Sequence, residues 1–354
     1  MLHLLGFEVG FCPHAECAWS LAHFVGNELA GLNSIGASVT AAQYAKNVIK
    51  LREIIDRLYN NSQQIPMIVA PGAFFDEKWY GKFLRKTGRG VVDVLTHHIY
   101  NMGAGDDPKL IYRFVNSTYL SQVSSTFEHL EKVIQKNAPW GATSVGEAGG
   151  AYQGGRPHLS YTFINSFWYL DQLGMASMYN TKVYYRPTLI GGFYGVIKSS
   201  TLLPKPDYYG ARLCHRLIGD GHKTQQWDPS VLKIENNVSS NLRSHAHCSR
   251  GRSGVTLLFI NLSNATDFII DVENNINLSL MKIDSPREEY HLTPKDGFVR
   301  SSTVLLNGNP LETTKEGDIP NLIPIYRHSN SSIHIAGWSI AFIVVPHFVA
   351  PACN

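Results

Sequence analysis

Two glutamates, Glu28 and Glu147, stand where short apolar runs of the chain end. Glu28 follows the run that ends at Val25, and Glu147 ends the run 142–147. Parallel α/β folds place catalytic side chains at the carboxyl ends of their strands. Either glutamate alone is more often a surface or capping residue. Together, with the Asn27 amide available to a sugar hydroxyl, they meet the requirement of glycoside hydrolysis for one protonated and one ionised carboxyl group.

A histidine pair, His97 and His98, lies near the end of another apolar run, just before Tyr100. Residues i and i+2 share one face of a strand. We therefore expect His98 and Tyr100 to line a cleft and His97 to pack behind them. Adjacent histidines make a poor tetrahedral zinc motif without a third ligand at clear spacing, so we predict no metal. A buried, hydrogen-bonded histidine is the alternative interpretation.

The sequence lacks the motifs of several other common catalytic and cofactor-binding sites. The chain has no G-x-S-x-G motif, P-loop, Rossmann fingerprint or C-x-x-C pair. A zinc or redox enzyme therefore has no supporting spacing, and we predict that no cofactor is needed. Tyr152, Tyr185 and Tyr194 are candidates to stack on sugar rings, whereas we assign Trp168 to the core.

The elements before residue 220 alternate between strands and helices. Helices are predicted at 40–59, 77–86, 117–136, 159–173 and 206–218, and strands at 65–70, 91–100, 142–147 and 175–185. The strand at 65–70 should end at Pro71-Gly72. Such alternation predicts βαβ units around a parallel sheet.

The pattern changes near residue 221. Short apolar runs at 255–261, 267–272, 303–306 and 340–345 are separated by turns rich in Asn, Gly, Pro and Ser. This spacing predicts an antiparallel β-sandwich. We therefore divide the chain into an atypical segment 1–25, the C-terminal half of a β/α barrel at 26–220 and a sandwich at 221–354.

Composition limits the class and indicates a compartment. Of 354 residues, 44% are hydrophobic and 17% charged, with a net charge of +3. This is a globular chain with no nucleic-acid footprint and no apolar run long enough to span a membrane. More N-x-S/T acceptors than chance predicts suggest a secretory history, although the N-terminal residues make a poor signal peptide. The acceptors are Asn60, Asn116, Asn237, Asn261, Asn264, Asn277 and Asn330.

Several motifs together resemble the heparanase-like proteins of plants, in glycoside hydrolase family 79. The resemblance runs from about residue 26 to the C-terminus and rests on Gly26-Asn27-Glu28-Leu29, His97-His98-Ile99-Tyr100-Asn101, Gly146-Glu147-Ala148-Gly149-Gly150-Ala151-Tyr152, Ser166-Phe167-Trp168-Tyr169-Leu170-Asp171-Gln172-Leu173-Gly174, Pro206-Asp207-Tyr208-Tyr209 and Glu289-Tyr290-His291-Leu292-Thr293. It implies an eight-stranded β/α barrel followed by a β-sandwich, and retaining cleavage of β-glucuronides.

The same resemblance assigns roles to residues. It implies that Glu28 is the acid/base, with a raised pKa, and that Glu147 is the nucleophile. It implies a disulfide between Cys248 and Cys353. The substrate-contacting positions that it implies are Asn27, His98, Tyr100, Tyr152, Gly154 and Tyr194.

Three departures from the family bear on function. Relatives carry a longer N-terminal part, Pro187 replaces their usual Gln, and Phe193 replaces their usual Asn. A heparan-sulfate enzyme needs basic residues around its cleft, whereas the loop 71–79 is mixed and aromatic. We therefore expect an unsulfated glucuronide, such as an arabinogalactan-type side chain or a small-aglycone glucuronide. An inactive, shortened family member that at most binds sugar is the alternative.

The family also indicates partners and location. We expect a glucuronic-acid-containing polysaccharide or proteoglycan glycan as the partner, and neither nucleic acid nor a transmembrane segment. The compartment implied is extracellular, cell wall or vacuole-like, with association at a membrane surface.

Overall fold

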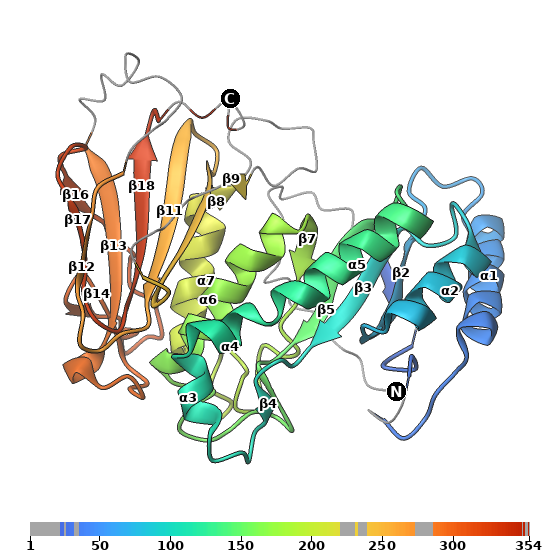
Figure 1. The fold of residues 1–354 in the computed structure, drawn as a ribbon, viewed down its shortest axis with the longest axis horizontal. Helices are drawn as coiled ribbons and strands as arrows, with labels where there is room; N and C mark the ends of the chain where they lie inside the picture. The colour runs from blue at the N-terminus through green and yellow to red at the C-terminus, as the bar shows by residue number, and fades with distance from the viewer. Residues whose placement is uncertain are drawn as a thin grey trace.

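The computed structural model describes residues 22–24, 26–31, 35–219, 231–232, 239–272, 286–348, 350 and 353. Two sheets organise this part of the chain, a parallel sheet near the N-terminus and an antiparallel sheet near the C-terminus, with α6 (Phe163–Met178) and α7 (Pro206–Leu217) next to the latter (Figure 1). Cys12, Cys17, Asn237, Asn277 and most of the predicted segment 1–25 lie outside the described residues.

The parallel sheet has the order β1-β2-β3-β5-β7, so each strand pairs with the next long strand along the chain. Its strands are β1 (Ala22–Phe24), β2 (Met67–Phe74), β3 (Val94–Ile99), β5 (Ala142–Ala148) and β7 (Thr181–Tyr184). The helices before α6 are α1 (Ala41–Leu58), α2 (Glu77–Thr87), α3 (Leu110–Phe114), α4 (Ser117–Ser121) and α5 (Ser124–Asn137). The predicted βαβ organisation is thus confirmed, and all carboxyl ends meet at one edge.

Local hydrogen bonds explain where helix α1 begins and where a predicted helix is interrupted. Helix α1 begins after Thr40, whose side chain accepts a hydrogen bond from the Gln43 N–H. The single helix predicted at 117–136 is two helices. The Ser124 hydroxyl donates to the Ser121 carbonyl, which competes with regular helix bonding at the junction. Residues 175–178 extend α6 instead of starting a strand.

Strand β2 continues beyond its predicted end at Pro71-Gly72. Its pairing with β3 shifts register between Pro71 and Ala73, and Gly72 has a φ of 61°. A bulge of this kind absorbs one extra residue without ending the strand. The continuation places Phe74 opposite His98 of β3.

The antiparallel sheet has the order β15-β14-β13-β18-β11-β10-β8, with β16 on β13 and β9 on β10. Its strands are β8 (Ile218–Gly219), β9 (Val231–Leu232), β10 (Leu242–Ser249), β11 (Gly254–Asn261), β13 (Arg287–Pro294), β14 (Val304–Leu306), β15 (Asn309–Pro310), β16 (Ile325–Arg327) and β18 (Ser339–Pro346). A short 3-10 turn, Lys295–Gly297, follows β13. Two small ribbons pair β4 (Gly103–Ala104) with β6 (Ala151–Tyr152), and β12 (Phe268–Ile270) with β17 (Ile333–Ile335).

Both faces of the antiparallel sheet are covered. Leu258 and Phe342 belong to the same buried cluster as residues of α6 and α7. On the other face, Phe268 and Ile335 of the β12–β17 ribbon pack with Leu257. Strand β8 already belongs to the antiparallel sheet. This sheet therefore begins at Ile218, shortly before the predicted boundary at residue 220. No helix in the described ranges is long and apolar enough to cross a membrane.

A disulfide joins Cys248 of β10 to Cys353, as the resemblance implies. Among the predicted glycosylation sites, the structure contradicts Asn261 as an exposed acceptor. Its side chain is fully buried, and its amide donates to the carbonyls of Thr266 and Ala336 at 2.7 and 3.0 Å. The acceptors with exposed side chains are Asn60, Asn116, Asn264 and Asn330.

Candidate active site

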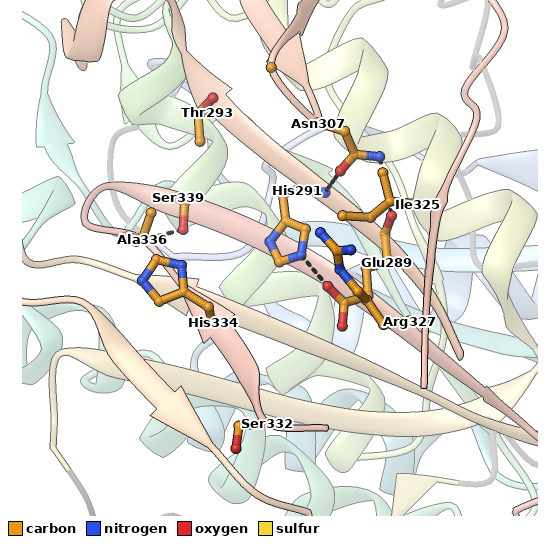
Figure 2. Close-up of a pocket in the computed structure, with 11 residues that line it drawn as sticks. Glu289, His291, Thr293, Asn307, Ile325, Arg327, Ser332, His334, Ala336 and Ser339 are labelled. Carbon is orange, nitrogen blue, oxygen red and sulfur yellow. Dashed lines mark hydrogen bonds and ion pairs between the residues drawn. The ribbon is translucent and has the colours of Figure 1, made fainter. Parts of the chain in front are cut away.

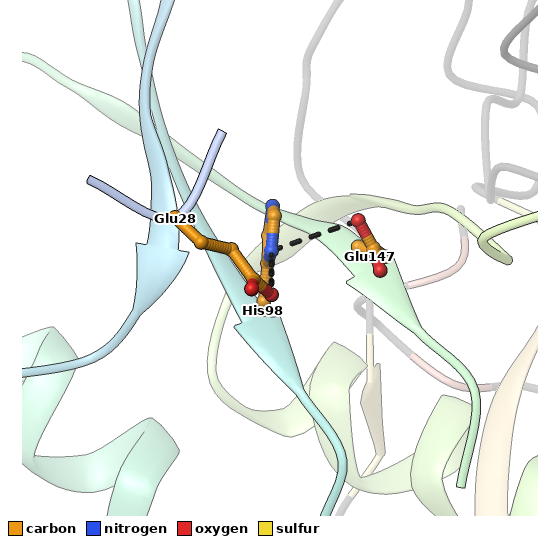
Figure 3. A group of neighbouring side chains, drawn as sticks. All are labelled: Glu28, His98 and Glu147. Atoms are coloured by element: carbon orange, nitrogen blue, oxygen red, sulfur yellow. Dashed lines mark hydrogen bonds and ion pairs between the residues drawn. The ribbon is translucent and has the colours of Figure 1, made fainter. Parts of the chain in front are cut away.

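Glu28, His98 and Glu147 converge at the carboxyl edge of the parallel sheet (Figure 3). The Nδ1 atom of His98 lies 3.0 Å from Oε1 of Glu28 and 3.7 Å from Oε2 of Glu147. An oxygen of each glutamate and a nitrogen of the histidine lie within 4.8 Å of one another. The two carboxyl groups are therefore close enough to act on one bond.

The backbone at Glu28 is held in an unusual conformation. Its φ is 51°, in the left-handed region that residues with a Cβ rarely adopt. Its N–H donates to the carbonyl of Gly72 at 2.7 Å, which ties the turn after β1 to the bulge of β2. Strained positions of this kind concentrate at functional sites, because the surrounding structure must hold them in place.

Glu147 reaches the site through a register shift between β3 and β5. His97 is opposite Val145, but His98 is opposite Glu147, so Gly146 is left unpaired. A Cβ on Gly146 would lie 2.2 Å from Oγ1 of Thr96, so this position requires glycine. The shift brings Glu147 to the same side of the sheet as His98.

Two tyrosines border Glu147. The hydroxyl of Tyr100 donates a hydrogen bond to Oε1 of Glu147, and the Tyr194 ring lies 6.2 Å from the Tyr100 ring. Gly149 provides the space, since a Cβ there would lie 2.6 Å from the Tyr100 ring. Burial, followed by the charge of Glu147, raises the pKa of Tyr100 far above its usual range. Tyr100 therefore keeps its proton and remains a donor.

His97 packs behind the sheet, as the alternation along β3 predicts. It is fully buried, with the ring edge-on to Phe127 at 5.6 Å. Burial, aided by neighbouring His98, lowers the pKa of His97 to about 3. His97 is thus a neutral core residue, whereas His98 contacts both glutamates.

Among the remaining predicted residues, some side chains are exposed and others are buried in the core. The carbonyl of Gly154 accepts from the N–H of Phe193, the residue before Tyr194, at 2.8 Å. Asn27 and Tyr152 have exposed side chains that make no hydrogen bond to the glutamates in the described part of the chain. Tyr185 is buried in a valine-rich cluster and is therefore a core residue. Trp168 is also buried, as predicted, and donates to Asn101.

Sequence reasoning missed the positioning role of Arg186. Arg186 is buried, donates to the Tyr194 carbonyl and to Asp207, and lies over the Tyr169 ring at 4.6 Å. It therefore fixes the backbone of Tyr194, and no local pattern signals this role.

The segment 71–79, which spans the end of β2 and the start of α2, contributes one aromatic side chain to the site instead of several. The half-exposed Phe74 ring lies 6.3 Å from His98 and 6.1 Å from Tyr100. Trp79 packs against Tyr44, and its indole N–H donates to the Val39 carbonyl, so it lies away from the site.

Glu28, His98 and Glu147 also form the group of described residues that could coordinate a metal ion. Two carboxylates and one imidazole are ordinary ligands for a divalent cation. In this geometry, however, Nδ1 of His98 is within hydrogen-bond distance of Glu28. The absence of a metal requirement stays a prediction from the sequence.

Known proteins with similar sequences include heparanase-like proteins and a glucuronidase. Residues 15–174 match the glycosyl hydrolase family 79 N-terminal domain. The chain is 47% identical to heparanase-like protein 1 of Arabidopsis thaliana, covering 93% of this chain and 64% of that protein. It is 36% identical to a baicalin β-D-glucuronidase of Scutellaria baicalensis, covering 93% and 58%. The chain thus spans less than two thirds of the length of these relatives.

A solved structure supports the fold. The GH51 α-L-arabinofuranosidase of Thermotoga petrophila superposes with a TM-score of 0.63 at 16% identity, over 91% of this chain and 65% of that one. The carboxyl pair therefore lies on a fold that the chain shares with this glycoside hydrolase. The chain is a homologue of the plant heparanase-like proteins, and its residues 15–174 match the N-terminal domain of glycosyl hydrolase family 79.

Proposed function

We propose that this chain hydrolyses β-glucuronides with retention of anomeric configuration. The observation that carries the proposal is the approach of Glu28 and Glu147 to within 4.8 Å, with His98 between them. Retaining enzymes hold their carboxyl groups about 5–5.5 Å apart, whereas inverting enzymes need about 6.5–9.5 Å to admit a water. The short separation supports retention.

In this mechanism Glu147 is the nucleophile. Its carboxylate attacks the anomeric carbon while protonated Glu28 gives its proton to the leaving oxygen. Glu28 then removes a proton from the water that hydrolyses the glycosyl-enzyme, which returns both groups to their first state.

The surroundings of each carboxyl group support this division of roles. The Glu147 side chain is 22% exposed, against 11% for Glu28, and its orientation is fixed by the Tyr100 hydroxyl. A fixed, accessible carboxylate suits in-line attack, because the reacting atoms must be aligned at about 3–3.5 Å. The more enclosed Glu28 suits proton transfer to a leaving group that fills the site.

The substrate we propose is an unsulfated glucuronide, on an arabinogalactan-type glycan or a small aglycone. Half-exposed Phe74 beside His98 and half-exposed Phe193 beside Gly154 support this choice. Aromatic faces favour sugar rings and flat aglycones, whereas sulfate recognition uses several cationic side chains. A glucuronic-acid-containing polysaccharide or proteoglycan glycan is the larger partner in this proposal.

We also propose finer features of fold and location. The parallel sheet corresponds to part of a β/α barrel, and the antiparallel sheet with its β12–β17 ribbon to a sandwich. Secretion is supported by the Cys248–Cys353 disulfide, since disulfides persist in oxidising compartments. An extracellular, cell-wall or vacuole-like location would also permit glycans on the exposed acceptors.

The test is hydrolysis of 4-nitrophenyl β-D-glucuronide by the purified chain, followed by proton NMR of the first sugar product. We expect the β-anomer of glucuronic acid to appear before mutarotation produces the α-anomer. An α-anomer first would contradict retention. A cooperatively folded chain without turnover would favour the inactive alternative, in which the same residues at most bind sugar.

A further inference from the structure

A pocket lies in the antiparallel part of the molecule (Figure 2). Its volume is about 440 Å³, and it is bounded by β13, β16, β17 and the turn between β14 and β15. Small-molecule sites commonly have volumes of about 300–1,000 Å³. None of its lining residues belongs to the group around Glu28 and Glu147.

The floor of this pocket has a polar composition that packing does not explain. Glu289 and His291 of β13 are paired with Ile343 and Ala341 of β18, and those two residues belong to the apolar cluster under the β12–β17 ribbon. Apolar residues on β13 would extend that cluster. Instead, Glu289 is buried together with Arg287, which carries a desolvation cost.

The buried charges in the floor compensate one another. Oε1 of Glu289 accepts from Nε of Arg287 at 2.6 Å, and Oε2 is 2.8 Å from Nε2 of His291. The other Arg287 nitrogens donate to backbone carbonyls, including that of Ser332 at 2.9 Å. Glu289 therefore adds little net negative charge to the pocket.

One positively charged side chain of the pocket has no ion-pair partner among the described residues. Arg327 of β16 is paired directly with Arg287 of β13, so both side chains lie on the same face. Its guanidinium is exposed and makes no ion pair or hydrogen bond within the described residues. Like charges directly opposite each other in a sheet are unfavourable. The nearby carboxylate of Asp267 is already engaged by His334 and the Gly337 N–H.

The rest of the lining mixes polar and apolar groups, with Ile325, His334 and Ala336 beside the hydroxyl groups of Thr293 and Ser332 and the open backbone of Gly308. The Ser339 hydroxyl donates to the Ala336 carbonyl, and the Asn307 amide donates to the carbonyls of Glu289 and Ile323. Figure 2 shows the His291 ring directed toward Glu289. The side-chain oxygen of Asn307 accepts a hydrogen bond from the backbone N–H of His291. Such a surface matches a ligand with several hydroxyl groups and one negative charge.

We propose that this pocket binds one acidic sugar unit, a uronate, with its carboxylate on Arg327 and its hydroxyls on Thr293 and Ser332. The site holds a glycan and performs no chemistry. The negative charge of the ligand follows from the pocket alone. The choice of a sugar among small carboxylates rests on the proposed function.

The experiment is carbene footprinting of the full chain, read by mass spectrometry, with sodium D-glucuronate as the probe. Free glucuronate has no bond for the enzyme to cleave, so the wild type can be used. We expect concentration-dependent protection of peptides covering 286–294 and 325–335. Arg327→Gln should raise the half-protecting concentration about tenfold or more, because a charge-assisted bond is lost. Arg300→Gln, at an exposed arginine outside the pocket, should leave it unchanged.

Three results would overturn the inference. Protection confined to peptides within 94–101 would mean that glucuronate binds only beside Glu147. Equal protection by D-glucose would mean that the carboxylate does not contribute to binding. Equal protection by sodium acetate would mean that the sugar ring does not contribute to binding. Melting temperatures of the two variants within about 2 °C of wild type would show that folding is intact. Since footprinting requires no turnover, an inactive chain that still protects this pocket would contradict only the proposed function.

Discussion

Two groups in this molecule join a glutamate to a histidine, with opposite consequences. Glu28 and Glu147 come from separate strand ends of the parallel sheet and share His98. Glu289 contacts His291 from within a single strand of the antiparallel sheet, and Arg287 binds its other oxygen. The first group brings two carboxyl groups of like charge together, whereas the second group pairs one carboxylate with a cation.

The difference shows how neighbours determine what a carboxyl group can do. Two carboxyl groups at short range disfavour the state in which both are ionised, so a proton can be held and passed on. For Glu289, burial opposes ionisation, but His291 and Arg287 outweigh it and hold its pKa below the usual range. That carboxylate stays ionised and serves structure instead of proton transfer.

The largest expected effect is at Glu147. Glu147→Gln keeps the shape of the side chain but removes the attacking charge, so turnover of a β-glucuronide should fall by about 10⁴-fold or more. The free energy of unfolding should change by less than about 1 kcal/mol, because the residue is part-exposed. Steady-state kinetics with urea unfolding measures both, and retained turnover would end the assignment of Glu147 as nucleophile.

Glu28→Gln should slow turnover by about 10²–10⁴-fold, the usual contribution of general acid–base catalysis. The loss should depend on the leaving group, because 4-nitrophenolate departs without protonation whereas an alkyl alcohol needs a proton. Comparing kcat/KM for nitrophenyl and alkyl glucuronides measures this dependence. Equal losses on both substrates would argue against an acid role for Glu28.

Glu289→Gln should act on stability. It leaves the buried Arg287 without its carboxylate, and breaking a buried ion pair costs about 3–5 kcal/mol. Urea unfolding at pH 7 measures the change, with Glu316→Gln as a control at an exposed position. A loss as small as that of the control would mean that the Arg287–Glu289 pair does not hold β13 in place.

The smallest expected effect is the acid sensitivity caused by His97. Its folded pKa of about 3 lies below the unfolded value of about 6.5, so its stabilising contribution is complete above pH 6.5 and is lost as the pH falls toward 3. His97→Leu should therefore reduce the loss of unfolding free energy between pH 7 and pH 5 by about 1–2 kcal/mol. The exposed His129→Leu serves as the control, and an unchanged pH slope in His97→Leu would contradict the burial argument.

Sequence reasoning predicts which residues form the first group, but not the strand register that brings them together. Both glutamates were found because each follows an apolar run, and alternation separated His98 from His97. The register shift at Gly146 was not found, because it depends on Thr96 in the neighbouring strand. The continuation of β2 through Gly72 escaped notice for the same reason, since proline and glycine usually end a strand.

The pocket beside the second group was beyond a local pattern. It combines residues from β13, β16, β17 and a turn, which meet only when the antiparallel sheet forms. Burial is also decided there, as Asn261 illustrates. Its sequon is indistinguishable from the exposed one at Asn264, yet its amide is enclosed by backbone carbonyls.

By itself, the sequence determined the kinds of element, the two candidate carboxyl groups and the histidine between them, because period and residue type are local properties. The tertiary structure alone decided that Glu28 and Glu147 approach to within 4.8 Å, and that Arg327 lies opposite Arg287 with no counter-charge among the described residues. Those outcomes depend on strand register, and register is set by packing between segments far apart in the chain.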